Sequence, residues 1–179
     1  MKDKVLILAY MGSGKTEAEK RYLNVLDMDF QDFKFVYDKS IAHLPLEQRK
    51  GNTALRAENP DYPGNWIDAV LHQLAVGKSI VVSPFIEHVF DAVDSARFKA
   101  KGHDVRVILA APSKDNFQEY AMRFKNRGNN EEFIERRRAE WQRLSDLFET
   151  AKEYERITLA PGQFLDNALS GHGIRLVPR

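Results

Sequence analysis

The sequence predicts an α/β fold of three layers, in which helices cover both faces of a five-stranded parallel sheet. Short apolar runs rich in β-branched residues alternate along the chain with longer segments of helical period, a pattern typical of parallel strands joined by helices. Right-handed crossovers would bring the carboxyl ends of the strands to one rim, where such sheets bind ligands. The expected strands are Lys4–Tyr10, Asn24–Phe30, Ser79–Ser83, Asp104–Ala111 and Arg156–Ala160.

Five helices are expected around these strands. Asn65 is placed to cap the second of them, and Asn129 with Glu132 has the spacing of a capping box before the fifth. The expected helices run from the glycine loop to about Tyr22, over 66–76, over 86–99, from just after Pro112-Ser113, and over 131–152.

Length and composition restrict the functional classes. A chain of 179 residues suits one domain, 1–179. Its net charge of +1 argues against bulk nucleic-acid binding, and the absence of cysteine excludes disulfides, a thiol nucleophile and a zinc–thiolate site. Because no apolar run approaches ~20 residues and no secretory segment is seen, we expect a cytoplasmic protein without a membrane partner. The oligomeric state stays open.

A glycine-containing loop follows the first expected strand, in the stretch "VLILAYMGSGKTE". In a phosphate-binding loop, glycines let backbone N–H groups surround phosphate oxygens, and the following helix N-terminus adds partial positive charge. Lys15 would then reach the β- and γ-phosphates, and the Thr16 hydroxyl would hold Mg²⁺. The expected phosphate-binding residues are Gly12, Ser13, Gly14, Lys15 and Thr16.

Ala9 stands where this motif normally opens with glycine. An alanine is acceptable there if its backbone φ is negative, because only positive φ strongly favours glycine. We therefore expect the loop to keep its function.

Two aspartates end the second expected strand. Alternation along a strand places Asp27 and Asp29 on the same side, at the rim beside the loop. There they suit a Mg²⁺ shell, a hydroxyl acceptor or a base, although aspartates also commonly start a solvated turn. The third strand does not end in an acid, so the second carboxylate that usually serves Mg²⁺ is missing from that place. Asp27 is therefore the more important candidate. The sequence lacks the Asn-Lys-x-Asp motif of a GTPase, and Asp61–Gly64 matches Asp-x-x-Gly only by letters.

Seven basic residues lie between Arg123 and Arg143. On a helix, Arg137 and Arg138 border the apolar stripe that contains Trp141. Such arginines suit an anionic partner, for which a transferring phosphoryl group is a candidate. Alternatively, the arginines of this segment pair with Glu131, Glu132 and Glu135 on a solvated helix.

Taken together, these features resemble the nucleoside monophosphate kinase branch of the P-loop phosphotransferases. The resemblance rests on "GSGKT", on "DMD" at the second strand end, on the insertion after it, and on "RFKNRGNNEEFIERR". There is also some likeness to shikimate-type kinases and to small kinase-like proteins of bacteriophages. The resemblance to the nucleoside monophosphate kinases implies the P-loop NTPase fold and an ATP- and Mg²⁺-dependent kinase. It also implies a small anionic acceptor such as a nucleoside or deoxynucleoside monophosphate.

The resemblance also assigns roles to residues. Segment 31–66, aromatic and then rich in Asn, Pro and Gly, would be the acceptor-binding insertion, and 123–138 would be the lid. Thr16 and Asp27 would hold the metal. The acceptor would be contacted by Asp29, Phe33, Arg56, Tyr62 and Trp66. The residues that serve phosphoryl transfer would be Lys15, Asp27, Asp29, Arg123, Arg127 and Arg137. The adenine of ATP would lie at Pro161 and Gly162.

The chain departs from this pattern after its third strand, where "SPFIEH" lacks the arginine that usually grips the acceptor phosphate. Arg56 is the candidate for that role. Two other functions remain open: a kinase of a hydroxylated metabolite or a nucleic-acid 5′ end, and a nucleotide-binding regulatory module with little transfer activity.

Overall fold

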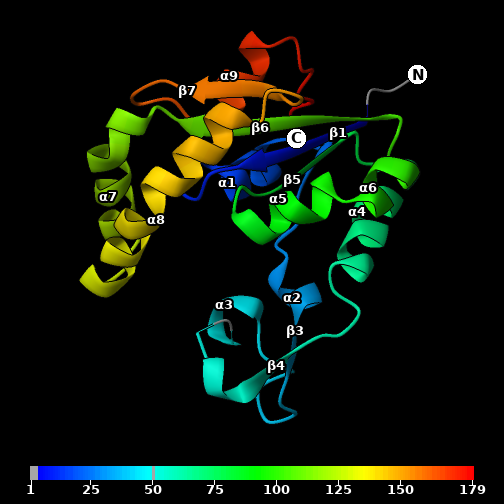
Figure 1. Ribbon diagram of the computed structural model, residues 1–179, viewed down its shortest axis with the longest axis vertical. Helices are drawn as coiled ribbons and strands as arrows, with labels where there is room; N and C mark the ends of the chain where they lie inside the picture. The colour runs from blue at the N-terminus through cyan, green and yellow to red at the C-terminus, as the bar shows by residue number, and fades with distance from the viewer. Residues whose placement is uncertain (1–3, 50) are drawn as a thin grey trace.

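The computed structural model describes residues 4–49 and 51–179, and a five-stranded parallel sheet forms their centre (Figure 1). The strand order is β2-β5-β1-β6-β7, which confirms the predicted sheet. Central β1 pairs in parallel with β5 on one side and β6 on the other. The strands are β1 (Lys4–Ala9), β2 (Val25–Asp27), β5 (Ile80–Pro84), β6 (Val105–Pro112) and β7 (Glu155–Leu159).

Both faces of the sheet are apolar, as the alternation of side chains along β1 shows. Leu6 and Leu8 belong to the core on one face, whereas Val5, Ile7 and Ala9 belong to the core on the other. Each of these five side chains is at most 2% exposed. A strand that is buried on both faces needs a layer of helices on each side.

Helices form those two layers (Figure 1). The larger core joins one face of the sheet to five helices, and the smaller core joins the other face to α1 and α9. The first set comprises α4 (Gly64–Val76), α5 (Glu87–Asp94), α6 (Ala96–Lys101), α7 (Phe117–Asn126, after the short η2, Lys114–Asn116) and α8 (Glu131–Thr150). The second comprises α1 (Lys15–Arg21) and α9 (Leu165–Gly171).

The helix expected over 86–99 is interrupted at Ser95. Its hydroxyl donates to the carbonyl of Ala92 at 2.6 Å and accepts from the backbone N–H of Phe98 at 3.3 Å. One serine thus closes α5 and caps α6, because its short side chain competes with the helical hydrogen bonds.

Two predicted helix caps are wrong: the cap of α4 is Pro63, two residues before Asn65, and the cap of α8 lies one residue after Asn129. α4 begins at Gly64, so Asn65 lies inside its first turn, where its amide donates to the carbonyl of Phe33 at 2.9 Å. α8 is capped by Asn130, which accepts from Phe133 N–H at 2.9 Å. The N–H of Asn129 instead bonds to the carbonyl of Phe124 and closes α7.

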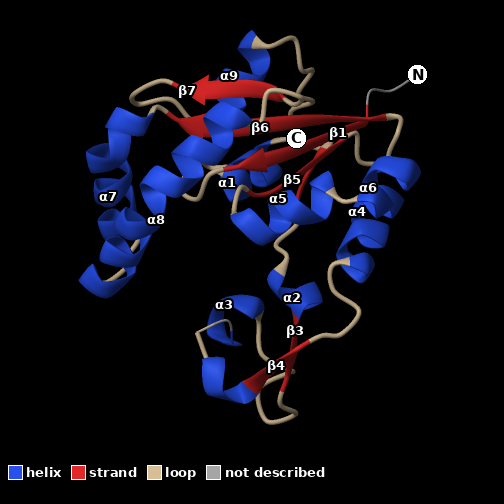
Figure 2. Ribbon diagram, in the orientation of Figure 1, coloured by secondary structure: helices blue, strands red, loops and turns tan. Residues whose placement is uncertain are grey.

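The insertion after β2 has secondary structure of its own and extends away from the main sheet (Figure 2). Its two strands pair antiparallel, and Arg49 bridges to Asp32 at 2.9 Å. The segments are α2 (Gln31–Lys34), β3 (Phe35–Tyr37), α3 (Leu46–Arg49), η1 (Thr53–Leu55) and β4 (Arg56–Glu58).

Across the described ranges, none of the helices combines the length and the apolar character that crossing a bilayer requires. α8, with 20 residues, is amphipathic: its buried face includes Ile134, Trp141 and Leu144, and the opposite side carries charge.

Candidate active site at the glycine loop

The glycine loop connects β1 to α1 in a conformation that needs its glycines. Gly12 and Gly14 have φ of 82° and 94°, and both lie in the left-handed region that other residues avoid. Ala9 is a core residue, and no non-glycine residue in the described chain has positive φ. The substitution of the leading glycine therefore leaves the loop unstrained, as predicted.

Lys15 begins α1 and turns back towards the end of β1. Its ammonium donates to the carbonyls of Ala9 at 3.1 Å and Tyr10 at 3.4 Å. Burial lowers the pKa of Lys15, whereas the nearby carboxylates of Asp27 and Asp29 act to raise it. The lysine is thus held at the rim among opposite charges, and a polyphosphate would add the countercharge that burial makes favourable.

The next residue joins the loop to the second strand. The Thr16 hydroxyl donates to the carboxylate of Asp27 at 2.7 Å. Asp29, two residues further, accepts from the backbone N–H of Gln31 at 3.0 Å and starts the turn into α2. Both aspartates lie close enough to Lys15 to influence its pKa. β2 ends at Asp27, so Asp29 lies beyond the strand and not within the expected Asn24–Phe30.

The residues at this rim suit Mg²⁺ bound together with a nucleotide. Mg²⁺ prefers oxygen ligands and usually takes one or two from the protein, the others coming from water and phosphate. Thr16 and Asp27 offer an adjacent hydroxyl and carboxylate. The described residues contain no cluster of three or more acidic, histidine or cysteine side chains that would hold a metal alone. The donor set therefore fits a metal–nucleotide complex better than an all-protein site.

Arg123 on α7 connects two loops that are far apart in sequence. Its guanidinium donates to the carbonyl of Gly12 at 3.0 Å and to the carbonyl of Gln163 at 3.0 Å. It also pairs with Glu119, one turn earlier, and lies 4.2 Å from the centre of the Phe164 ring. The sequence predicted a lid arginine near ATP; the structure shows a partly buried link between the glycine loop and the loop after β7.

Glu119 is a residue that the sequence analysis missed. Its carboxylate accepts from the backbone N–H of Gly162 at 3.0 and 3.1 Å and from the side chain of Asn116 at 3.0 Å. These donors and Arg123 together lower its pKa against the effect of burial. The sequence signal that could have identified Glu119 is its position four residues before Arg123 on one helix, a spacing at which opposite charges pair. Glu119 holds the Pro161–Gly162 turn, the expected adenine position, against α7.

The other arginines of the predicted lid differ in their surroundings. Arg127 is the exposed C-cap residue of α7, and its positive charge acts to lower the pKa of Lys15. Arg137 is 13% exposed, pairs with Glu140 at 2.8 Å, and has a buried Nε without a hydrogen-bond partner among the described residues.

Arg136 and Arg138 are more exposed than Arg137. They pair with Glu132 at 3.1 Å and Glu135 at 3.2 Å. Solvated ion pairing therefore describes these two arginines, whereas Arg137 is partly buried beside the core.

The residues expected at the acceptor lie in different environments. Trp66 has no exposed surface and belongs to the main core, so it offers no face to a ligand in this conformation. Phe33 and Tyr62 are partly buried against that core. Arg56 lies on β4, with its guanidinium 3.8 Å from the centre of the Phe35 ring. The structure thus brings Phe33 and Tyr62 to the junction between the insertion and the main body, and Arg56 into the hairpin.

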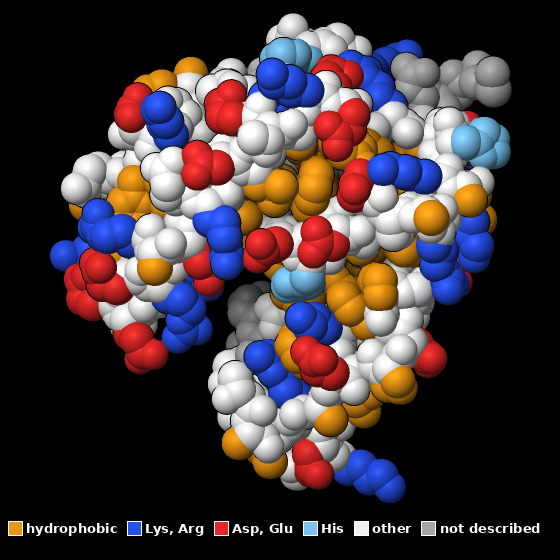
Figure 3. All heavy atoms as spheres, viewed as in Figure 1, with side chains coloured by type: hydrophobic (Ala, Val, Ile, Leu, Met, Phe, Trp, Pro, Cys, Tyr) orange, Lys and Arg blue, Asp and Glu red, His pale blue; other side chains and the backbone are white. Residues whose placement is uncertain are grey.

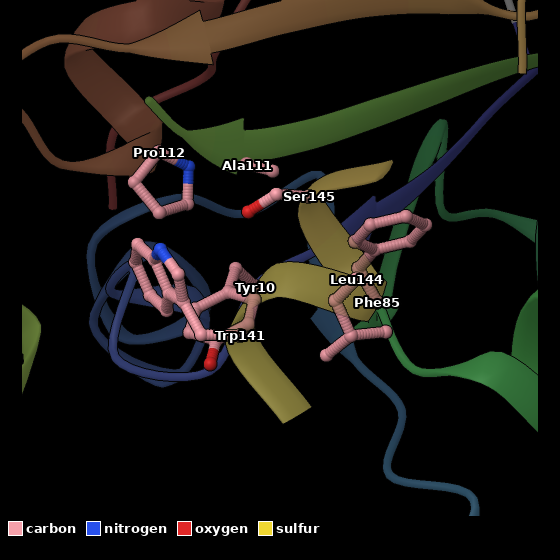
Figure 4. A pocket seen from close by; sticks show the side chains of 7 residues that line it. All are labelled: Tyr10, Phe85, Ala111, Pro112, Trp141, Leu144 and Ser145. Atoms are coloured by element: carbon pink, nitrogen blue, oxygen red, sulfur yellow. The ribbon is translucent and has the colours of Figure 1, made fainter. Parts of the chain in front are cut away.

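A small cavity lies behind the glycine loop, between Tyr10 and Trp141 (Figure 4). Its volume is about 10 Å³, which suits one water molecule at most. This cavity is therefore too small for a nucleotide.

Neither a protein-family model nor a curated protein matches this sequence. Among solved structures, the Deinococcus radiodurans tunicamycin resistance protein matches with a TM-score of 0.56 and 13% identity, covering 99% of each chain. The chain has a P-loop NTPase-like fold. At this identity the likeness shows the fold alone.

Removing the guanidinium of Arg123 is expected to weaken nucleotide binding. Arg123→Ala separates the glycine loop from the loop after β7, and we expect the Kd for ATP to rise about tenfold, equivalent to about 1.4 kcal/mol. Arg123→Lys keeps the charge but cannot donate to both carbonyls in the same geometry, so it should restore little of the affinity. Calorimetric titration with ATP measures both variants.

Lys125→Ala is the matched control, because Lys125 is exposed on the same helix. An ATP affinity for Arg123→Ala equal to that of this control would show that the link has no role in binding.

Proposed function

We propose that this protein is an ATP- and Mg²⁺-dependent phosphotransferase that acts on a nucleoside or deoxynucleoside monophosphate. The contact between Thr16 and Asp27, beside Lys15 at the end of β1, carries the proposal. Lys15, Thr16 and Asp27 offer a cation, a hydroxyl and a carboxylate beside the N-terminus of α1. The helix N-terminus and the two glycines with positive φ favour phosphate binding there.

On the donor side, the N–H groups of the loop from Gly12 to Thr16 would bind the phosphates of ATP, and Lys15 would reach the β- and γ-phosphates. Thr16 and Asp27 would hold Mg²⁺, which when bound supplies charge neutralisation and orientation of the phosphate oxygens. Arg123 and Glu119 would position the loop containing Pro161 and Gly162 at the base.

On the acceptor side, Asp29 and Arg56 would orient the monophosphate, with Phe33 and Tyr62 near the base. The γ-phosphoryl group of ATP would pass to a phosphate oxygen of the acceptor, giving ADP and a nucleoside diphosphate. Such transfer depends mainly on positioning and charge stabilisation. Arg127 and Arg137, on the two helices beside the loop, would neutralise the developing charge.

The test is ATP turnover by the wild-type protein with each ribo- and deoxyribonucleoside monophosphate as acceptor. We expect one or a few of these acceptors to yield a diphosphate and ADP in equal amounts when magnesium is present. Transfer only to a hydroxyl acceptor, such as a nucleoside or a 5′-hydroxyl oligonucleotide, would show that the acceptor is not a nucleoside monophosphate. ATP binding without transfer to any acceptor would instead identify a nucleotide-binding module.

A further inference from the structure

A partly buried histidine occupies the rim of the sheet without a role in the mechanism above. His88 lies in the first turn of α5, directly after β5, and β5 runs between β2 and β1. Its side-chain Nε2 is buried and has no hydrogen-bond partner among the described residues. Buried polar atoms in native proteins are nearly always paired, so this nitrogen beside the rim is one that a water molecule or a ligand would satisfy.

Two aromatic rings from separate segments surround this imidazole. The Phe30 ring, just after β2, lies 4.5 Å from its centre at an interplanar angle of 74°. The Tyr62 ring, from the connection between β4 and α4, lies at 6.0 Å and 69°, and its hydroxyl donates to the backbone carbonyl of His88 at 3.5 Å. The histidine therefore lies where the insertion joins the main body, and the surface view shows a deep notch between the insertion and the α7–α8 side (Figure 3).

Burial, assisted by one nearby cation, keeps His88 neutral. Burial lowers the pKa of His88 to about 4, and the ammonium of Lys34 acts in the same direction. Lys34 itself bridges to Glu58 at 3.7 Å and lies 5.8 Å from the centre of the Tyr62 ring. At neutral pH the imidazole thus carries one N–H donor and one lone pair, without a charge.

This environment discriminates between the parts of a nucleotide. A phosphate group is best bound by charged, multiple donors, whereas here the imidazole is neutral and the neighbouring lysine has a carboxylate partner. A nucleobase has apolar faces and an edge of uncharged donors and acceptors, which match two aromatic rings and a neutral imidazole. A polar group in such a site can select strongly, because a mismatched ligand leaves it unpaired.

We propose that His88 is a specificity-determining residue whose Nε2 hydrogen-bonds the base edge of the acceptor nucleotide, with Phe30 and Tyr62 against the base. This inference rests on the proposed function, and it assigns base selection to the rim beside β5. The phosphate end of the acceptor would point towards Lys15, where transfer takes place.

Two isosteric substitutions test which nitrogen matters. The amide of His88→Gln can place a polar group near the position of Nε2, whereas the shorter His88→Asn reaches only the position of Nδ1. With the four deoxynucleoside monophosphates as acceptors, we expect His88→Asn to reduce the preference of the wild type between bases about tenfold in kcat/KM, the loss of about 1.4 kcal/mol. His88→Gln should retain most of the preference.

The control is His103→Asn, because His103 is exposed and precedes β6, at the opposite end of the strands. Its base preference should equal that of the wild type. If His88→Asn lowers kcat/KM for all four bases by the same factor, or if none of the four is an acceptor, the inference is wrong. Turnover by the wild type separates the two failures: no transfer to any nucleoside monophosphate overturns the proposed function, whereas transfer with a base preference that His88→Asn leaves unchanged overturns this inference alone.

A measurement on the unmodified protein covers the case in which a variant does not fold. In ¹⁵N-labelled protein, saturation with the preferred deoxynucleoside monophosphate should shift the imidazole Nε2 resonance of His88 and leave that of His103 unchanged. A bound nucleotide that leaves the His88 resonance in place would overturn the inference.

Discussion

Lys15→Ala is expected to lower kcat/KM for phosphoryl transfer by on the order of 10³, the upper range for removal of one donor to a developing charge. Lys15 lies at the end of β1 with Asp27 and Asp29 nearby, and in the proposed function its charge would meet the transferred group. Without it, the negative charge that spreads over the phosphoryl oxygens loses its nearest cation. Steady-state assays of ADP release with a saturating acceptor measure the effect.

Lys20→Ala is the matched control for this substitution. Lys20 lies on the same helix, is exposed, and pairs only with Glu17 among the described residues, one turn away. Its removal should leave activity within about twofold, because exposed pairs contribute little. Equal activities for the two alanine variants would contradict a catalytic glycine loop, whatever the acceptor.

Asp27→Asn should reduce kcat by about 10²-fold, at least the loss that follows when even an outer partner of a metal ligand is removed. The substitution keeps the size of the side chain and its ability to accept from Thr16, but removes the negative charge that would favour Mg²⁺. The magnesium concentration for half-maximal activity should therefore rise. Titration of turnover with magnesium at fixed ATP measures that shift.

Asp104→Asn provides the control for a lost carboxylate. Asp104 lies before β6, at the amino ends of the strands, and pairs with Lys4 at the surface. It should leave the magnesium titration unchanged. A midpoint for Asp27→Asn equal to that of the wild type would remove Asp27 from the metal site.

The sheet and the glycine loop could be predicted because their signals are local. Apolar runs such as Leu6 to Leu8 report burial on both faces, and Gly12 and Gly14 report a backbone that other residues cannot adopt. Helix ends were less predictable. Whether Asn65 caps its helix depended on the carbonyl of Phe33, which lies more than thirty positions earlier.

The roles of the lid and acceptor residues could not be predicted in the same way. Spacing on a helix placed Arg123 in a basic segment, but its partners Gly12 and Gln163 come from two other loops. Trp66 has an aromatic ring that could stack on a base, yet the fold buries it completely. His88 has no motif around it, and only the convergence of Phe30 and Tyr62 gives it significance.

Sequence alone determined that this chain forms a parallel sheet with a glycine loop at its rim, because periodicity and glycine positions act over a few neighbouring residues. Only the tertiary structure decided which charged and polar groups meet at that rim. Those contacts join residues from separate segments, and the physical cause is burial: Lys15 and His88 owe their shifted pKa values first to the protein packed around them.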